Sequence, residues 1–186
     1  MPPKQKVTKD MIIDTALAVV RAQGHEAVNA RSIAAALGCS TQPVFSNFDS
    51  MDQLKLAVVE AADAMFREFM NDEIRAGKYP PYKASGMAYI RFAREERELF
   101  KLLYMRDRRG EKQPSQTQTG TRMDQLVNIG TGLSGDEASI FHLEMWAVVH
   151  GLAVMAVTDH LDLEEELVSR MLTDCFQGLK KQYGKE

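Results

Sequence analysis

Apolar residues recur at the spacing of α-helices through most of the chain. The first such stretch follows Thr8, whose hydroxyl suits a helix N-cap, and it ends at Gly24. Asn29 is placed to cap a second helix over 31–37, and Ser40 to cap a third that runs to about Asn47. Strand-like alternation is absent, so the pattern predicts an all-α fold.

The two short helices in this region are separated by a very short turn. Gly38, Cys39 and Ser40 join them, and glycine supplies the left-handed backbone that a helix end commonly needs. Two short helices around a tight turn containing glycine are typical of a helix-turn-helix. Ser50 then caps a fourth, long helix that runs from 51 to about 76.

A second helical region follows a break at 77–81. Residues 82–105 predict one helix or two adjoining helices, and the segment 107–121, rich in Gln, Thr, Ser and Gly, predicts a loop. A shorter helix near 121–132 comes next. We therefore expect about nine helices in two linked parts: a three-helix head joined by the long helix to a larger bundle.

The last two helices are predicted near 138–155 and 162–183. In the first of them, apolar residues form a seam with a period of 3.5, which suits packing against an aligned helix: Ala138, Phe141, Met145, Val148, Leu152 and Met155. Its opposite side is apolar too, so this helix should be covered on both sides. A four-helix dimer bundle formed by these two helices and closure of the core of one chain are both compatible with the pattern.

Composition and charge restrict the kind of partner. The chain has 186 residues, 45% of them hydrophobic, and a net charge of -3, so any nucleic-acid site must be local. The six basic residues of the first sixty are balanced by six acidic ones; the basic ones are Lys4, Lys6, Lys9, Arg21, Arg31 and Lys55. Eleven methionines suit either an adaptable ligand pocket or an ordinary helical core.

Several function classes find no support in the sequence. Cys39 and Cys175 are isolated, which argues against a disulfide framework, a metal site or a cofactor held by cysteines. The N-terminus lacks the apolar core of a signal peptide, and the longest apolar run, 146–157, is too short to span a membrane. No phosphate-binding glycine loop or nucleophile elbow is present. We expect a cytoplasmic protein that is not an enzyme.

The N-terminal region resembles the DNA-binding module of the TetR family of transcription regulators. Residues 29–40 read NARSIAAALGCS and match the family's second helix and turn; residues 41–54 read TQPVFSNFDSMDQL and match its recognition helix and the start of the fourth helix. The resemblance implies a DNA-binding domain over 1–55 and a ligand-sensing and dimerisation domain over 56–186. It also implies a homodimer that contacts two major grooves of a palindromic operator in double-stranded DNA.

The resemblance also implies which residues contact DNA. They are Arg31, Ser40, Thr41, Gln42, Pro43, Phe45, Ser46, Asn47 and Lys55. Gln42 suits bidentate bonding to adenine, although a solvated surface glutamine is the alternative. The family's usual tyrosine is Phe45 here and its frequent lysine is Met51, so two phosphate contacts are missing. We therefore expect modest affinity and a shallow salt dependence.

The C-terminal half carries a weaker resemblance. Trp146 followed by His150-Gly151 is similar to a subtype of the family that has a Trp-to-His-Gly helix. The resemblance implies a pocket for a small apolar or amphipathic effector, lined by Tyr89, Phe100, Tyr104, Met105, Trp146 and His150. A packed core histidine beside a tryptophan is the alternative. Effector binding would move the heads through the long helix and release DNA, as in a repressor.

Cys39 allows a second kind of regulation. Because it lies in the turn beside the recognition helix, its oxidation would disturb DNA binding. No cationic side chain adjoins it in sequence to lower its pKa, which favours a small buried side chain instead.

Overall fold

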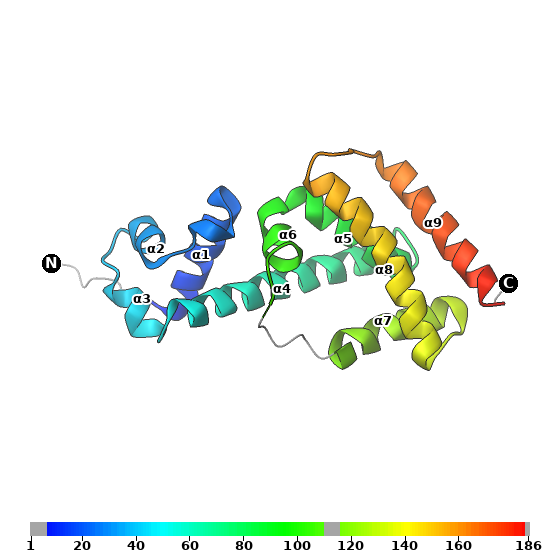
Figure 1. Cartoon of the computed structure of the whole chain (residues 1–186), viewed down its shortest axis with the longest axis horizontal. Coiled ribbons are helices and arrows are strands. Elements are labelled where there is room, and N and C mark those ends of the chain that lie inside the picture. The colour runs from blue at the N-terminus through cyan, green and yellow to red at the C-terminus, as the bar shows by residue number, and fades with distance from the viewer. Residues whose placement is uncertain (1–6, 110–115, 185–186) are drawn as a thin grey trace. The chain divides into compact units, whose positions relative to one another are not determined.

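The computed structural model describes residues 7–109 and 116–184, and within these ranges every regular element is a helix (Figure 1). The elements are α1 Lys9–Gln23, the 3-10 turn η1 His25–Ala27, α2 Ala30–Ala36, α3 Gln42–Asn47, α4 Met51–Ala76, α5 Pro81–Glu95, α6 Arg97–Tyr104, α7 Gln116–Thr131, α8 Gly135–Val157 and α9 Glu165–Gln182. The predicted all-α architecture is confirmed.

The chain forms two compact units. The first comprises the residues up to 67 together with 96–106, and the second comprises 68–95 and the residues after 106. Helix α4 contributes its part up to Arg67 to the first unit and the remainder to the second. The predicted functional boundary between residues 55 and 56 stays a prediction.

The core of the first unit is built from α1 to α4 and α6. Ile12, Ile33, Leu54 and Leu99 are fully buried in it. Helix α6 packs against α1. The guanidinium of Arg21 donates two hydrogen bonds of 2.8 Å each to the carboxylate of Glu96, which fixes the start of α6 against the end of α1.

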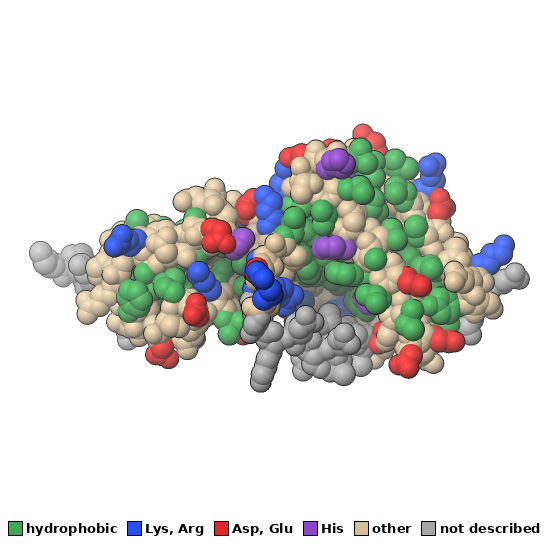
Figure 2. All heavy atoms as spheres, in the orientation of Figure 1, with side chains coloured by type: hydrophobic (Ala, Val, Ile, Leu, Met, Phe, Trp, Pro, Cys, Tyr) green, Lys and Arg blue, Asp and Glu red, His purple; other side chains and the backbone are tan. Residues whose placement is uncertain are grey.

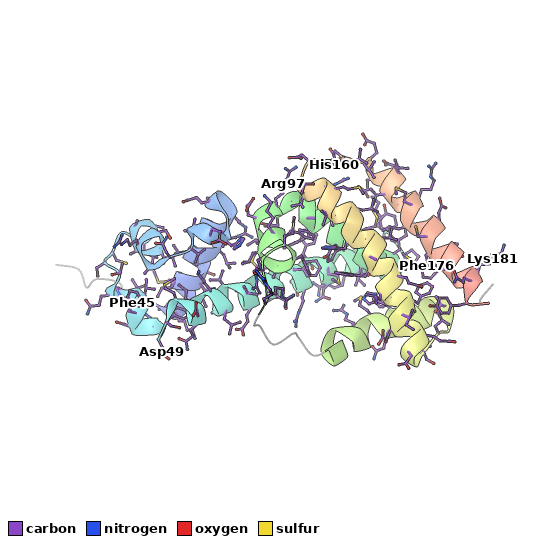
Figure 3. The ribbon with its side chains drawn as sticks, in the orientation of Figure 1. Phe45, Asp49, Arg97, His160, Phe176 and Lys181 are labelled. Atoms are coloured by element: carbon purple, nitrogen blue, oxygen red, sulfur yellow. The ribbon has the colours of Figure 1, made fainter. Side chains whose placement is uncertain are left out.

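The second unit is a bundle in which α8 contacts α5, α7 and α9. Its largest fully buried side chains are Phe92, Phe141, Leu133 and Val127, and α8 and α9 lie side by side (Figure 1). Phe176 of α9 points toward α8 and contacts Phe141, with ring centroids 5.3 Å apart (Figure 3). Aromatic packing therefore contributes to the contact between α8 and α9.

Most of the helix ends agree with the caps that the sequence offers. The backbone N–H of Met11 donates to the Thr8 hydroxyl, and that of Gln53 donates to the Ser50 hydroxyl, both at 3.2 Å. Gly24 ends α1 with φ 83°. Ser40 is not the cap of α3: Thr41 is the N-cap, with helical φ and ψ and no side-chain capping bond. The predicted cap was therefore one residue early.

Two further expectations were wrong in detail. Helix α7 begins at Gln116, so residues 116–121 are helical and not part of a loop; residues 110–115 lie outside the described ranges. In α8 the buried seam follows a period of 3.6 and not 3.5: beyond Met145 it continues through Val149 and Ala156, while Met155 is 38% exposed. A straight α-helix drifts away from a 3.5 repeat, and over 23 residues the drift moves the seam by one position.

Candidate nucleic-acid interface and effector unit

The α2–turn–α3 segment has a well-defined start and end. Asn29 and Ser32 form a capping box: the Asn29 side chain accepts from the backbone N–H of Ser32 at 3.0 Å, and the Ser32 hydroxyl accepts from that of Asn29 at 3.1 Å. At the other end of α2, Gly38 has φ 64°, and the N–H of Cys39 donates to the carbonyl of Ala34 at 3.0 Å. These bonds satisfy both ends of α2 and fix the direction in which α3 leaves the turn.

Helix α3 places one side in the core and the other in solvent. Val44, within α3, is 1% exposed, and Phe48, just after the helix, is 2% exposed. Gln42, Phe45 and Ser46 are exposed, and positions three and four apart share one helix face. Phe45 is 55% exposed and lies on the outer surface of its unit (Figure 3). An outward face with an amide and an unpaired aromatic ring is suited to contact with the edges of bases.

In the second unit a tyrosine of α5 is bonded to a histidine of α8. The Tyr89 hydroxyl and Nδ1 of His150 are 2.9 Å apart, and the Trp146 ring stacks on the His150 ring at 4.8 Å between centroids. Burial lowers the pKa of His150 and raises that of Tyr89. The histidine is therefore neutral at pH 7, and its Nδ1 shares one hydrogen bond with the tyrosine hydroxyl.

A second pair of the same kind lies further toward the N-terminal ends of these helices. The Tyr82 hydroxyl and Nδ1 of His142 are 3.0 Å apart. Burial raises the pKa of Tyr82 and lowers that of His142, and the Asp124 carboxylate raises both. The sequence analysis did not predict the Tyr82–His142 pair. The two tyrosines of α5 are seven positions apart and the two histidines of α8 are eight apart, so each set lies on one face of its helix, and this spacing was the available signal.

Comparison with protein families identifies the C-terminal half. Residues 82–175, 94 of the 186, match the family described as the C-terminal domain of tetracyclin repressor-like proteins. The chain belongs to the TetR family. The matched range includes Trp146, His150 and Gly151, on which the expected Trp-to-His-Gly subtype rests. No curated protein sequence is significantly similar to this chain.

Solved structures agree with the TetR family fold. A protein of unknown function from Rhodococcus sp. RHA1 has a TM-score of 0.78 at 19% identity, over 97% of this chain and 100% of that one. A TetR family member from Streptomyces coelicolor A3 gives 0.67 at 19% identity, over 90% and 96%. The multidrug binding protein EbrR, complexed with imidazole, gives 0.65 at 18% identity, over 90% and 88%.

The residues predicted to contact DNA all lie in the first unit. Exposed among them are Arg31, Ser40, Gln42, Phe45, Ser46 and Lys55, and half-buried are Thr41, Pro43 and Asn47. The amide nitrogen of Asn47 donates to the carbonyls of Pro43 at 2.8 Å and Val7 at 3.5 Å. A phosphate contact by Asn47 would have to replace one of these bonds. The DNA contacts themselves stay predictions.

The expected basic arm is only partly within the described residues. Lys4 and Lys6 lie outside them. The ammonium of Lys9 lies 5.0 Å from the centroid of the Phe48 ring, so it helps to cover the core of the TetR-type head. Cys39 and Cys175 are half-buried free thiols.

The six residues predicted to line one effector pocket belong to two groups. Tyr89, Trp146 and His150 contact one another in the second unit, as described above. Phe100 and Tyr104 lie in the first unit with ring centroids 5.0 Å apart, and Met105, the C-cap of α6, follows them with 44% exposure. A single pocket lined by all six stays a prediction.

Two properties of the structure concern what a membrane-spanning helix and a metal site require. Helix α8 is long and apolar enough to cross a membrane by length and composition alone, a test that core helices also pass. Within residues 7–109 and 116–184, no group of three or more His, Cys, Asp or Glu side chains is arranged to hold a metal ion.

Proposed function

We propose that this TetR family protein is a ligand-responsive repressor that binds a palindromic operator as a homodimer. The observation that carries the proposal is the outward face of α3, where Gln42, Phe45 and Ser46 are exposed on a helix whose opposite side is anchored in the core. Gln42 is assigned to a base edge, and Phe45 to the methyl group of a thymine.

Affinity for the DNA backbone is assigned to Arg31 on α2 and Lys55 on α4, which are both exposed. Few other cations accompany them, because the acidic and basic residues of the head balance. The dependence of binding on salt should therefore be shallow, with a slope near that of two or three phosphate contacts. Most of the specificity then rests on the short α3 helix.

The homodimer is proposed because α8 has an uncovered apolar face. Ile140 is 50% exposed, Leu143 61% and Trp146 37%, although all three lie on a well-formed helix. Figure 2 shows hydrophobic side chains gathered over α8. Apolar patches of this kind mark interaction sites in soluble proteins, and a two-fold interface would cover the same face on both copies.

The second unit is proposed to bind the effector, a small apolar or amphipathic molecule. EbrR, which shares the fold, has been solved with imidazole and with ethidium; the ethidium complex gives a TM-score of 0.59. An effector that binds the DNA-free arrangement more tightly would lower the affinity for the operator. The protein would act in the cytoplasm, without a catalytic role.

The test begins with selection of binding sites from a random duplex library by the full-length protein. We expect enriched sites with two-fold symmetry and half-site centres about 34–36 Å apart. A mobility-shift titration then compares the wild type with Gln42→Ala, which should lose about 1–3 kcal/mol of binding free energy, and with Gln23→Ala, an exposed glutamine at the end of α1, which should bind as the wild type does. Equal loss in both variants, or no enriched sequence, contradicts the assignment.

A further inference from the structure

The second unit contains a carboxylate, Asp124, with one hydrogen-bonded oxygen and one oxygen without a partner among the described residues. Oδ2 of Asp124, on α7, accepts from the Ser139 hydroxyl at 3.2 Å. Oδ1 is shielded from solvent and has no hydrogen-bond partner among the described residues. Buried oxygens of ionised carboxylates are rarely left in this state, because the lost hydration is not replaced. No described side chain donates to this oxygen, so the N–H or O–H of a bound molecule would satisfy it.

The neighbouring polar groups do not supply that donor. The Tyr82 hydroxyl and Nδ1 of His142, 3.0 Å apart, are hydrogen-bonded to each other. Burial lowers the pKa of His142, and the imidazole is neutral at pH 7 despite the opposing effect of Asp124. Neither Tyr82 nor His142 therefore carries a positive charge that balances the charge of Asp124.

Tyr82 and His142 belong to an aromatic group. Tyr82 contacts His142 at 5.9 Å, Phe176 at 5.9 Å and Phe141 at 6.4 Å between ring centroids. Helix α7 comes close to Phe176, since a Cβ on Gly130 would lie 3.2 Å from Cζ of that ring. Asp124 thus lies near two rings of this group, Tyr82 of α5 and His142 of α8, and bonds to Ser139 one turn before His142.

A carboxylate combined with aromatic rings selects for one class of ligand. An organic cation can pair with the carboxylate while its charge also interacts with ring faces. An anionic ligand would be repelled by Asp124, and a neutral apolar one would leave Oδ1 without a donor. We propose that the effector is a monovalent organic cation with an apolar body, anchored by Asp124 beside Tyr82 and His142. This deepens the proposed function, because it rests on the second unit being the effector unit.

The test uses the full-length protein freed of nucleic acid, with ethidium and proflavine as cationic probes that carry amino donors and 8-anilinonaphthalene-1-sulfonate as an anionic probe. Binding is measured by fluorescence or calorimetry. Asp124→Asn, which keeps the shape and removes the charge, should weaken both cations about 10- to 100-fold and leave the anion unchanged or tighter. Asp136→Asn, an exposed residue in the first turn of α8, is the matched control and should bind as the wild type does.

Two additional measurements separate binding from folding. Asp124→Asn should unfold at the same temperature as the wild type or a higher one, because it replaces a half-buried carboxylate whose shielded Oδ1 has no hydrogen-bond partner. Asp124→Glu keeps the charge and should retain more cation affinity than Asp124→Asn. Equal cation affinity in the wild type and Asp124→Asn overturns the proposal, as does loss of the dimer in Asp124→Asn, which would assign Oδ1 to a cation of the second copy.

The same variants distinguish this inference from the wider function. If cations bind through Asp124 but do not release operator DNA in a mobility-shift assay, the cation site is supported and its role in regulation is contradicted. If operator DNA binds normally while no cation binds, the regulator stands and the assignment of ligand class is overturned.

Discussion

Leu143 provides the sharpest test of the proposed dimer. It lies on α8 with 61% of its surface exposed, and Ile140 one turn earlier is 50% exposed. Full burial of a leucine side chain is worth about 1.5–3 kcal/mol. The exposed share of Leu143, less what alanine would retain, corresponds to about 1 kcal/mol for each copy. A two-fold interface contains this contact twice, once from each copy, and the substitution removes both. Leu143→Ala should therefore weaken the dimer by about 2 kcal/mol, or about 30-fold in its dissociation constant.

Sedimentation equilibrium over a range of protein concentrations measures this dissociation constant directly. Leu56→Ala is the matched control, because Leu56 is 57% exposed on α4 in the first unit and lies on no proposed interface. We expect the control to dimerise as the wild type does. The reasoning is refuted if both variants have the same dissociation constant, or if the wild type is monomeric at micromolar concentrations.

Two further predictions concern stability. Burial lowers the pKa of both His142 and His150 from the ordinary value of 6.5, so the unfolded chain takes up protons at higher pH than the folded chain. The unfolding free energy should therefore fall as the pH is lowered from 7 to 5, less so in His142→Gln; a flat profile from denaturant titrations over that range would contradict it. Asn29→Ala removes the capping box of α2 and should cost about 1 kcal/mol in the same measurement, with Asn29→Asp close to the wild type; equal losses in the two variants would show that the cap contributes nothing.

The sequence predicts the head well because the signals there are local. Thr8, Asn29 and Ser50 each have a side chain that can cap only the helix immediately after them, and each does so in the structure. The third cap was misplaced because Ser40 and Thr41 are both good candidates, and only the backbone geometry, with Thr41 already helical, decides between them. Caps therefore locate helices to within about a residue, as assignments of helix ends generally do.

The second unit is predicted less well because its determining contacts join residues far apart in sequence. Tyr82 and His142 are sixty positions apart; the spacing within each helix places Tyr82 on one face with Tyr89, and His142 with His150, but does not show that the two faces meet. Nothing in the sequence around Asp124 distinguishes it from other acidic residues, since the shielding of its Oδ1 depends on how α7 packs against α8. Periodicity identifies the face of a helix that is buried, but not the partner that buries it.

Helix α8 shows why this limit matters for function. It is apolar on nearly every side, with a mean hydropathy of 1.6 over its most apolar window, yet only 39% of that window is buried in one chain. A lipid surface and a second copy would both cover the remainder, but Glu144 and His150 lie in the middle of the helix, where a bilayer would make their burial costly. A protein interface has room for such groups at its polar rim. The exposed face of α8 therefore favours a second copy of this chain, and the Leu143→Ala comparison measures how much that contact contributes.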